Sequence, residues 1–126
     1  MRTSVLRAVA ALACVASLAI PASASVYVSF DYWVTNQTTN GAIVYCYHRF
    51  APAFHKTEVA RGWAAPGARI ALRLPKQETT YELEAVFKKA GPDSKTVGTA
   101  ATKWWLTNGS KDRLVNENGT YGWKPF

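Results

Sequence analysis

Short runs of alternating apolar and polar residues, separated by turn-forming residues, constrain the fold of this chain more than any other feature. The clearest run is SVYVSFDYWVT at residues 25–35, and ARIALRL at residues 68–74 repeats the pattern. Successive side chains of a strand point to opposite faces, so a period of two indicates a strand with one buried face. We expect these apolar residues to face the core: Val26, Val28, Phe30, Tyr32, Val34, Ala68, Ile70, Leu72 and Leu74.

Three further segments are predicted to be β-structure from their composition. AIVYCYHRF at residues 42–50 is β-branched or aromatic on both faces, which favours a central strand. KTVGTAATKWWLT at residues 95–107 also has the composition of a strand. In RLVNENGTYGW at residues 113–123, Asn118-Gly119 is the strongest local hairpin signal in the chain.

Turn residues suggest how these strands are connected. Asn40-Gly41 can reverse the chain, so we expect residues 25–35 and 42–50 to pair as the first hairpin. Prolines and a glycine leave room only for a short strand at Thr57–Arg61, followed by a turn at Pro66-Gly67.

The segment TTYELEAVFKKAGPD at residues 79–93 fits two structures. Thr79 and Glu82 could cap a helix near residues 80–90, and Gly91-Pro92 could end it. However, its apolar residues also alternate with charged ones, as in a strand. If Leu74 pairs with Tyr81, then Leu72 lies opposite Leu83 and Arg73 lies opposite Glu82. This complementary register favours an antiparallel strand over the helix.

Six or seven short strands with frequent turns predict an all-β domain. We expect a small antiparallel β-sandwich, immunoglobulin-like or similar, or a small barrel. An α+β domain with a helix near residues 80–90 is the alternative. The predicted core contains Val28, Phe30, Val44, Ile70, Leu72, Leu83 and Trp104.

The first 24 residues have the pattern of a cleaved signal peptide. Arg2 and Arg7 precede an apolar run at residues 8–20, and Ala22-Ser23-Ala24 matches the small-residue cleavage site. We expect cleavage before Ser25, which leaves a single domain at residues 25–126 that is secreted or periplasmic. No later apolar segment is long enough to span a membrane.

Removal of the leader leaves a basic chain with one cysteine. The chain carries 15 basic and 8 acidic residues, and loss of Arg2 and Arg7 reduces its formal charge from +7 to +5. Such a charge suits acidic glycans or anionic lipid, although it also serves solubility. No Lys/Arg cluster or helix-turn-helix pattern indicates nucleic acid. Cys46 would have no disulfide partner in a monomer and is expected to be a buried apolar residue.

The sequence offers little support for catalysis or metal binding. It contains no recognised nucleophile, metalloprotease or phosphate-loop motif, and Glu82 and Glu84 are better explained by charge pairing. Cys46, His48 and His55 could in principle form a copper or zinc set, but their spacing matches no known motif. We therefore predict a non-enzymatic protein without a metal or cofactor.

Three N-glycosylation sequons begin at Asn36, Asn108 and Asn118. Asn108 and Asn118 each precede a glycine, and turn formation explains these two sites without glycans.

The paired indoles at Trp104 and Trp105 suggest a binding surface. Because neighbouring strand residues face opposite sides, Trp104 should join Leu106 in the core while Trp105 and Lys103 face outward. Trp33 is similarly out of phase with the apolar face of its strand. An exposed indole offers a flat apolar surface and one N–H donor, although a second sheet or a loop could instead cover Trp105.

These features predict an exported binding protein for a cell-envelope or extracellular ligand. The expected ligand is a glycan or an anionic surface, bound by Trp105, Lys103 and Trp33. The alternatives are a membrane-active protein that uses interfacial aromatic residues, or an inhibitor or immunity protein with a protein target.

Overall fold

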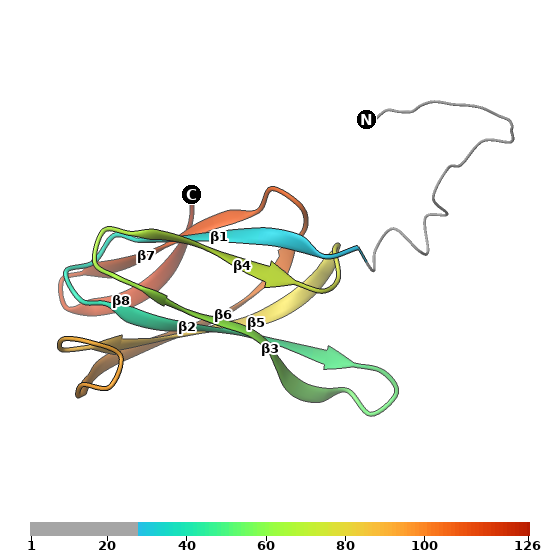
Figure 1. The fold of residues 1–126 in the computed structure, drawn as a ribbon, viewed down its shortest axis with the longest axis horizontal. Helices are drawn as coiled ribbons and strands as arrows, with labels where there is room; N and C mark the ends of the chain where they lie inside the picture. Colours follow the sequence, from blue (N-terminus) through green and yellow to red (C-terminus); the bar gives the residue numbers. More distant parts are fainter. Residues whose placement is uncertain (1–27) are drawn as a thin grey trace, which may run out of the picture.

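The structure is a computed structural model that describes residues 28–126, and the predicted leader and its cleavage site lie outside this range. It is a small β-sandwich of two four-stranded sheets (Figure 1). No helix long and apolar enough to cross a membrane occurs within residues 28–126. The strands are β1 (Phe30–Asn36), β2 (Ala42–Phe50), β3 (His55–Ala64), β4 (Arg69–Leu74), β5 (Thr79–Lys88), β6 (Thr96–Leu106), β7 (Lys111–Glu117) and β8 (Thr120–Pro125).

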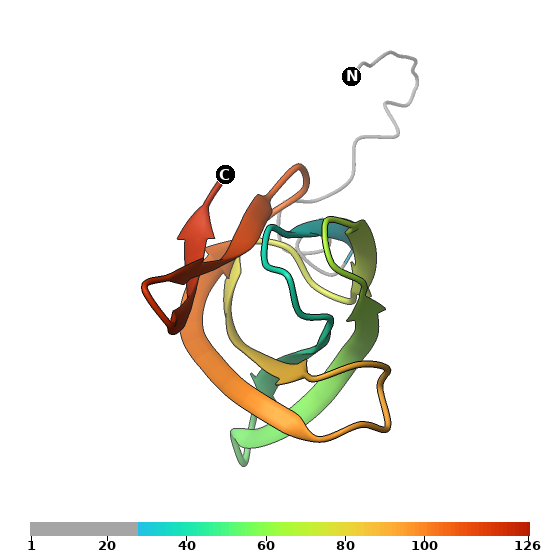
Figure 2. The same ribbon diagram turned by 90° about the vertical axis from the view of Figure 1, so that its left-hand side faces the viewer.

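The two sheets enclose one core. Sheet A has the strand order β4-β1-β7-β8, and sheet B has the order β3-β2-β5-β6. All pairs are antiparallel except β1 and β7, which are parallel. The end-on view of Figure 2 shows the strands curving around the core. The predicted sandwich is therefore confirmed, with eight strands in place of six or seven.

The predicted first hairpin is wrong, because β1 and β2 lie in different sheets. The buried Asn36 side chain donates to the carbonyl oxygens of Asn40 (2.8 Å) and Ala64 (2.9 Å). Its oxygen accepts from the backbone N–H of Thr38 at 3.0 Å and from the Thr38 hydroxyl at 2.8 Å. These bonds fix a connection that carries the chain from sheet A to sheet B.

Residues 79–88 form a strand, as predicted, but the predicted pairing of β4 with β5 is wrong. β5 lies between β2 and β6, whereas β4 pairs with β1, so that Phe30 lies beside Leu74 and Asp31 beside Arg73. Arg73 forms its ion pair with Asp31 at 3.2 Å and not with Glu82. An alternating pattern gives the buried face of a strand, but does not distinguish a neighbour in the same sheet from a residue across the sandwich.

β3 is longer than the predicted segment Thr57–Arg61. It continues through Gly62, where an added Cβ would lie 3.0 Å from Leu72 and 3.1 Å from Ile70. The glycine therefore marks a close approach of β3 to β4 and does not end the strand. The turns expected at Pro66-Gly67 and Asn118-Gly119 are present, since Gly67, Asn118 and Gly119 all have positive φ, whereas neither Asn40 nor Gly41 does.

Most of the predicted core is confirmed. Phe30, Val44, Leu72 and Leu83 are buried, whereas Ile70 and Trp104 are partly buried and pack against the core. Val28 is 45% exposed because it precedes β1, so its predicted burial is wrong.

Candidate functional site

The two adjacent indoles lie near the C-terminal end of β6, an edge strand of sheet B. Trp104 packs edge-on against Trp123 of β8, with ring centroids 6.1 Å apart. The Trp123 indole also donates to the carbonyl oxygen of Ala100 at 3.1 Å, which links β8 to β6. Trp105 points away from this contact and is 65% exposed. The predicted outward orientation of Trp105 is confirmed, whereas Trp104 lies at the margin of the core and not within it.

Lys103 shares the outer face of sheet B with Trp105. The register places Lys103 beside Glu82 and Trp105 beside Thr80 of β5. On the other side of β5, Glu82 is in register with Tyr47 of β2. Three strands, β2, β5 and β6, therefore place aromatic and charged side chains on one continuous face.

Two tyrosines form the aromatic part of this face. The rings of Tyr45 and Tyr47 stack with centroids 6.2 Å apart. The Arg61 guanidinium lies 5.0 Å from the Tyr45 centroid, and the Lys56 ammonium lies 4.4 Å from that of Tyr47. These cation–π contacts hold both rings in place across the sheet.

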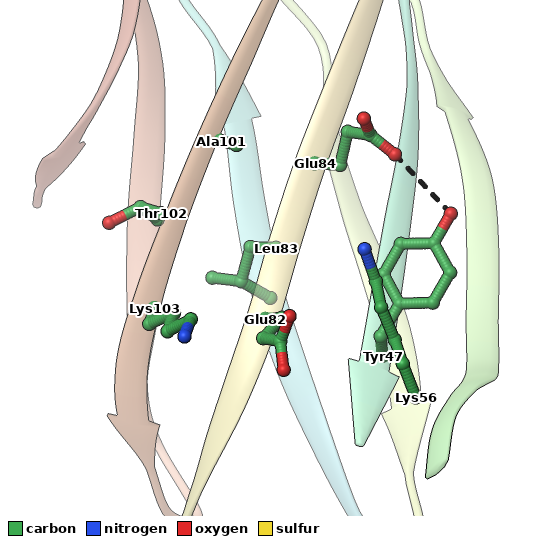
Figure 3. Close-up of a pocket in the computed structure, with 8 residues that line it drawn as sticks. All are labelled: Tyr47, Lys56, Glu82, Leu83, Glu84, Ala101, Thr102 and Lys103. Carbon is green, nitrogen blue, oxygen red and sulfur yellow. Dashed lines mark hydrogen bonds between the residues drawn. The ribbon is translucent and has the colours of Figure 1, made fainter. Parts of the chain in front are cut away.

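A hollow of about 270 Å³ opens between Tyr47 and β6 (Figure 3). It forms because Ala101 is small, while Lys103 and Glu84 flank it on neighbouring positions. A second hollow of about 280 Å³ shares Glu82 and Lys103 and extends toward the end of the sheet that carries Trp105. The first hollow is lined by Tyr47, Lys56, Glu82, Leu83, Glu84, Ala101, Thr102 and Lys103.

The two hollows together form one groove, and its carboxylates have defined partners. Arg49 binds Glu82 through its guanidinium, and this hydrogen bond holds the pKa of the Glu82 carboxyl below its ordinary value. Tyr47 donates to Glu84 at 3.3 Å, and burial followed by the charge of Glu84 raises the pKa of the Tyr47 hydroxyl. Ionised carboxylates and ammonium groups thus supply acceptors and donors side by side.

Trp33 lies on the other sheet. It is partly buried on the outer face of sheet A, with the Arg69 guanidinium 4.6 Å from its ring centroid. The structure therefore brings Lys103 and Trp105 together but does not bring Trp33 into the same groove. Lys111 lies between the two regions, because it is in register with Trp33 and also lines a hollow with Trp105.

The sequence reasoning missed Tyr45, Tyr47 and Glu84 as site residues. The composition of AIVYCYHRF predicts apolar residues on both faces, yet its tyrosines alternate with the buried Val44 and Cys46. The period-two phase of these residues was the signal that could have identified an outward aromatic pair.

The thiol and imidazole side chains do not form a metal site within residues 28–126, where no three His, Cys, Asp or Glu side chains lie close enough to hold an ion. Cys46 is buried as predicted, and burial raises the pKa of its thiol to about 12. His48 is also buried, with Nδ1 3.3 Å from the carbonyl oxygen of Thr80 and its ring beside Tyr81. His55 is exposed at the start of β3.

Comparison with known proteins gave no relatives: no protein-family model matches the chain, and neither does any curated protein or solved structure.

Proposed function

We propose that this chain is an exported, non-enzymatic protein that binds a glycan of the cell envelope or extracellular space. The observation that carries the proposal is the exposed Trp105 indole next to the groove of Lys103, Glu82 and Glu84, since Trp105 is in register with Thr80, which lines the second hollow. A flat indole suits the apolar face of a sugar ring. The groove supplies the charged donors and acceptors that sugar hydroxyls require.

The charge of this face favours a glycan over a strongly acidic ligand. Its cations, which include Lys56, Arg61 and Lys103, are interspersed with carboxylates. Arg49 already pairs with Glu82, and Arg61 already pairs with Glu58. A surface of mixed sign recognises a ligand through local hydrogen bonds more than through a long-range field. Binding should therefore persist at salt concentrations that screen exposed charges.

Export would bring the protein to such a ligand. The support is the leader pattern of residues 1–24, with its charged start, apolar run and Ala22-Ser23-Ala24 site. An inhibitor of a protein target is the second candidate, since an exposed indole can also anchor a protein interface.

The test is co-sedimentation of wild type and Trp105→Ala with insoluble peptidoglycan, chitin and cellulose. We expect Trp105→Ala to bind at least about thirtyfold more weakly, which corresponds to the roughly 2 kcal/mol of an anchor aromatic residue. Lys103→Ala should weaken binding less, because it removes one exposed polar contact and no stacking surface.

Lys95→Ala is the matched control for Lys103→Ala, because Lys95 is exposed near the opposite end of β6. It should bind like wild type. Retention of full polysaccharide binding by Trp105→Ala would rule out the proposed site. Absence of wild-type binding to all three polysaccharides would contradict the proposal for these glycans and favour a protein target.

A further inference from the structure

The loop between β2 and β3 presents an apolar tip that the groove does not use. Phe50, Ala51, Pro52, Ala53 and Phe54 follow one another, and every residue from 49 to 58 is exposed. Phe50 is 41% exposed and Phe54 is 60% exposed. The hairpin extends beyond the neighbouring strands at one end of the molecule (Figure 1). Apart from the edge-on contact of Phe50 with His48, whose ring centroids are 4.6 Å apart, folding gains little from this exposed apolar segment, which makes it a candidate interaction surface.

The backbone of the tip is a defined turn. Phe54 has a φ of 55°, in the left-handed region that a bulky side chain rarely adopts. Its N–H donates to the carbonyl oxygen of Phe50 at 2.8 Å, and Arg49 donates to the carbonyl oxygen of Phe54 at 3.4 Å. These bonds hold both phenylalanines in a turn whose backbone groups are partly satisfied within the loop itself.

Basic residues flank the tip on both sides. Arg49 precedes it, Lys56 follows His55 on the β3 side, and no acidic residue occurs between residues 49 and 57. Trp105 lies toward the same end of sheet B, because it pairs with Thr80, whose carbonyl oxygen contacts His48 of β2. The end of the sheet that carries the tip therefore combines exposed aromatic rings with the cations Arg49 and Lys56, of which Arg49 is also paired with Glu82.

We propose that the β2–β3 tip inserts into the interface of a membrane that contains anionic phospholipid. The five apolar residues carry no side-chain hydrogen-bonding group, so a polar protein surface would find no partner in them. A bilayer requires none, because Phe50 and Phe54 can enter the acyl boundary while Arg49 and Lys56 remain among the phosphates. This interaction does not depend on glycan binding, and it would place the Trp105 groove near the membrane surface.

The test uses a fluorescent reporter in the full chain. Cys14→Ser removes the other cysteine, and Phe54→Cys is labelled with an environment-sensitive nitrobenzoxadiazole dye. Cys46 is buried and should not label. The matched control carries the dye at Val97→Cys, which is 42% exposed in the wild type and lies near the opposite end of sheet B. The probes are vesicles of phosphatidylcholine with phosphatidylglycerol, or of phosphatidylcholine alone.

We expect the dye at position 54 to shift to the blue and brighten with anionic vesicles, and the dye at position 97 to change little. Adding Phe50→Ser should weaken the apparent vesicle affinity about tenfold, since a second inserted ring is lost. Trp105→Ala should retain the response, which separates this proposal from glycan binding. An unchanged signal at position 54, or an equal change at position 97, would overturn the proposal.

Discussion

Trp104 and Trp105 are chemically identical neighbours in different environments. Trp104 contacts Trp123 across the joint between β6 and β8, while Trp105 is exposed beside the groove. The difference comes from strand geometry, which places consecutive side chains on opposite faces. Whether each Trp is packed or exposed is therefore set by its position in the alternation of the strand and not by its residue type.

Alanine substitutions should separate the two roles. Trp104→Ala is expected to lower the free energy of unfolding by about 2–3 kcal/mol, less than the 3–5 kcal/mol of a fully buried Trp, because Trp104 is only partly buried. Trp105→Ala should leave the melting temperature nearly unchanged. Thermal unfolding followed by circular dichroism checks both. If Trp105→Ala proves equally destabilising, Trp105 is part of the core and the proposed binding face is wrong.

At the level of the strands, a buried hydrogen bond joins the parallel pair β1 and β7. The Tyr32 hydroxyl donates to the Asp112 carboxylate at 2.6 Å. Burial raises the pKa of the Asp112 carboxyl, and the hydrogen bond from Tyr32 only partly offsets this effect. Burial is also the main cause that raises the pKa of the Tyr32 hydroxyl. The strand pair thus contains a carboxylate whose ionisation opposes folding.

Asp112→Asn should therefore stabilise the protein at neutral pH. The folded state holds the Asp112 proton more tightly than the unfolded chain, so wild-type stability falls as pH rises from the unfolded to the folded pKa. Asparagine can accept the same bond from Tyr32 without a charge. We expect the melting temperature of the variant, relative to wild type, to be higher at pH 7 than at about pH 3, where carboxyls are largely protonated. An equal difference at both pH values would contradict this.

At the scale of the whole molecule, the two sheets are held together without a disulfide among residues 28–126. The shared core contributes most of the burial, and Asn36 adds a polar link, since it extends from β1 in sheet A to the Ala64 carbonyl of β3 in sheet B. Tyr121 covers one side of the core by stacking on Phe87, with ring centroids 4.1 Å apart. Gly98 leaves room for the Tyr121 ring.

Asn36→Ala should destabilise the sandwich by about 3 kcal/mol, because the buried Ala64 carbonyl and the Thr38 N–H lose their hydrogen bonds to Asn36, while the Thr38 hydroxyl keeps only its bonds to Asn40. Urea denaturation gives the free energy of unfolding. Asn108→Ala is the matched control, since Asn108 also begins a sequon but is exposed, and it should change stability little. Similar stability of Asn36→Ala and wild type would show that the link contributes little.

The sequence alone predicts most of the strand segments, the buried faces of most strands, and the turns at Pro66-Gly67 and Asn118-Gly119. These are local properties, because alternation and Asn-Gly or Pro-Gly pairs act within a few residues. The outward orientation of Trp105 and Lys103 followed from the same local phase, and the burial of Cys46 followed from its apolar surroundings. Which strands are neighbours follows from the three-dimensional packing and not from the pattern, because facing positions across a sandwich and neighbouring positions in a sheet require the same apolar pattern. The packing therefore also decides that Trp33 lies on the other sheet from Trp105, and that Tyr47, Glu82 and Lys103 meet in one groove.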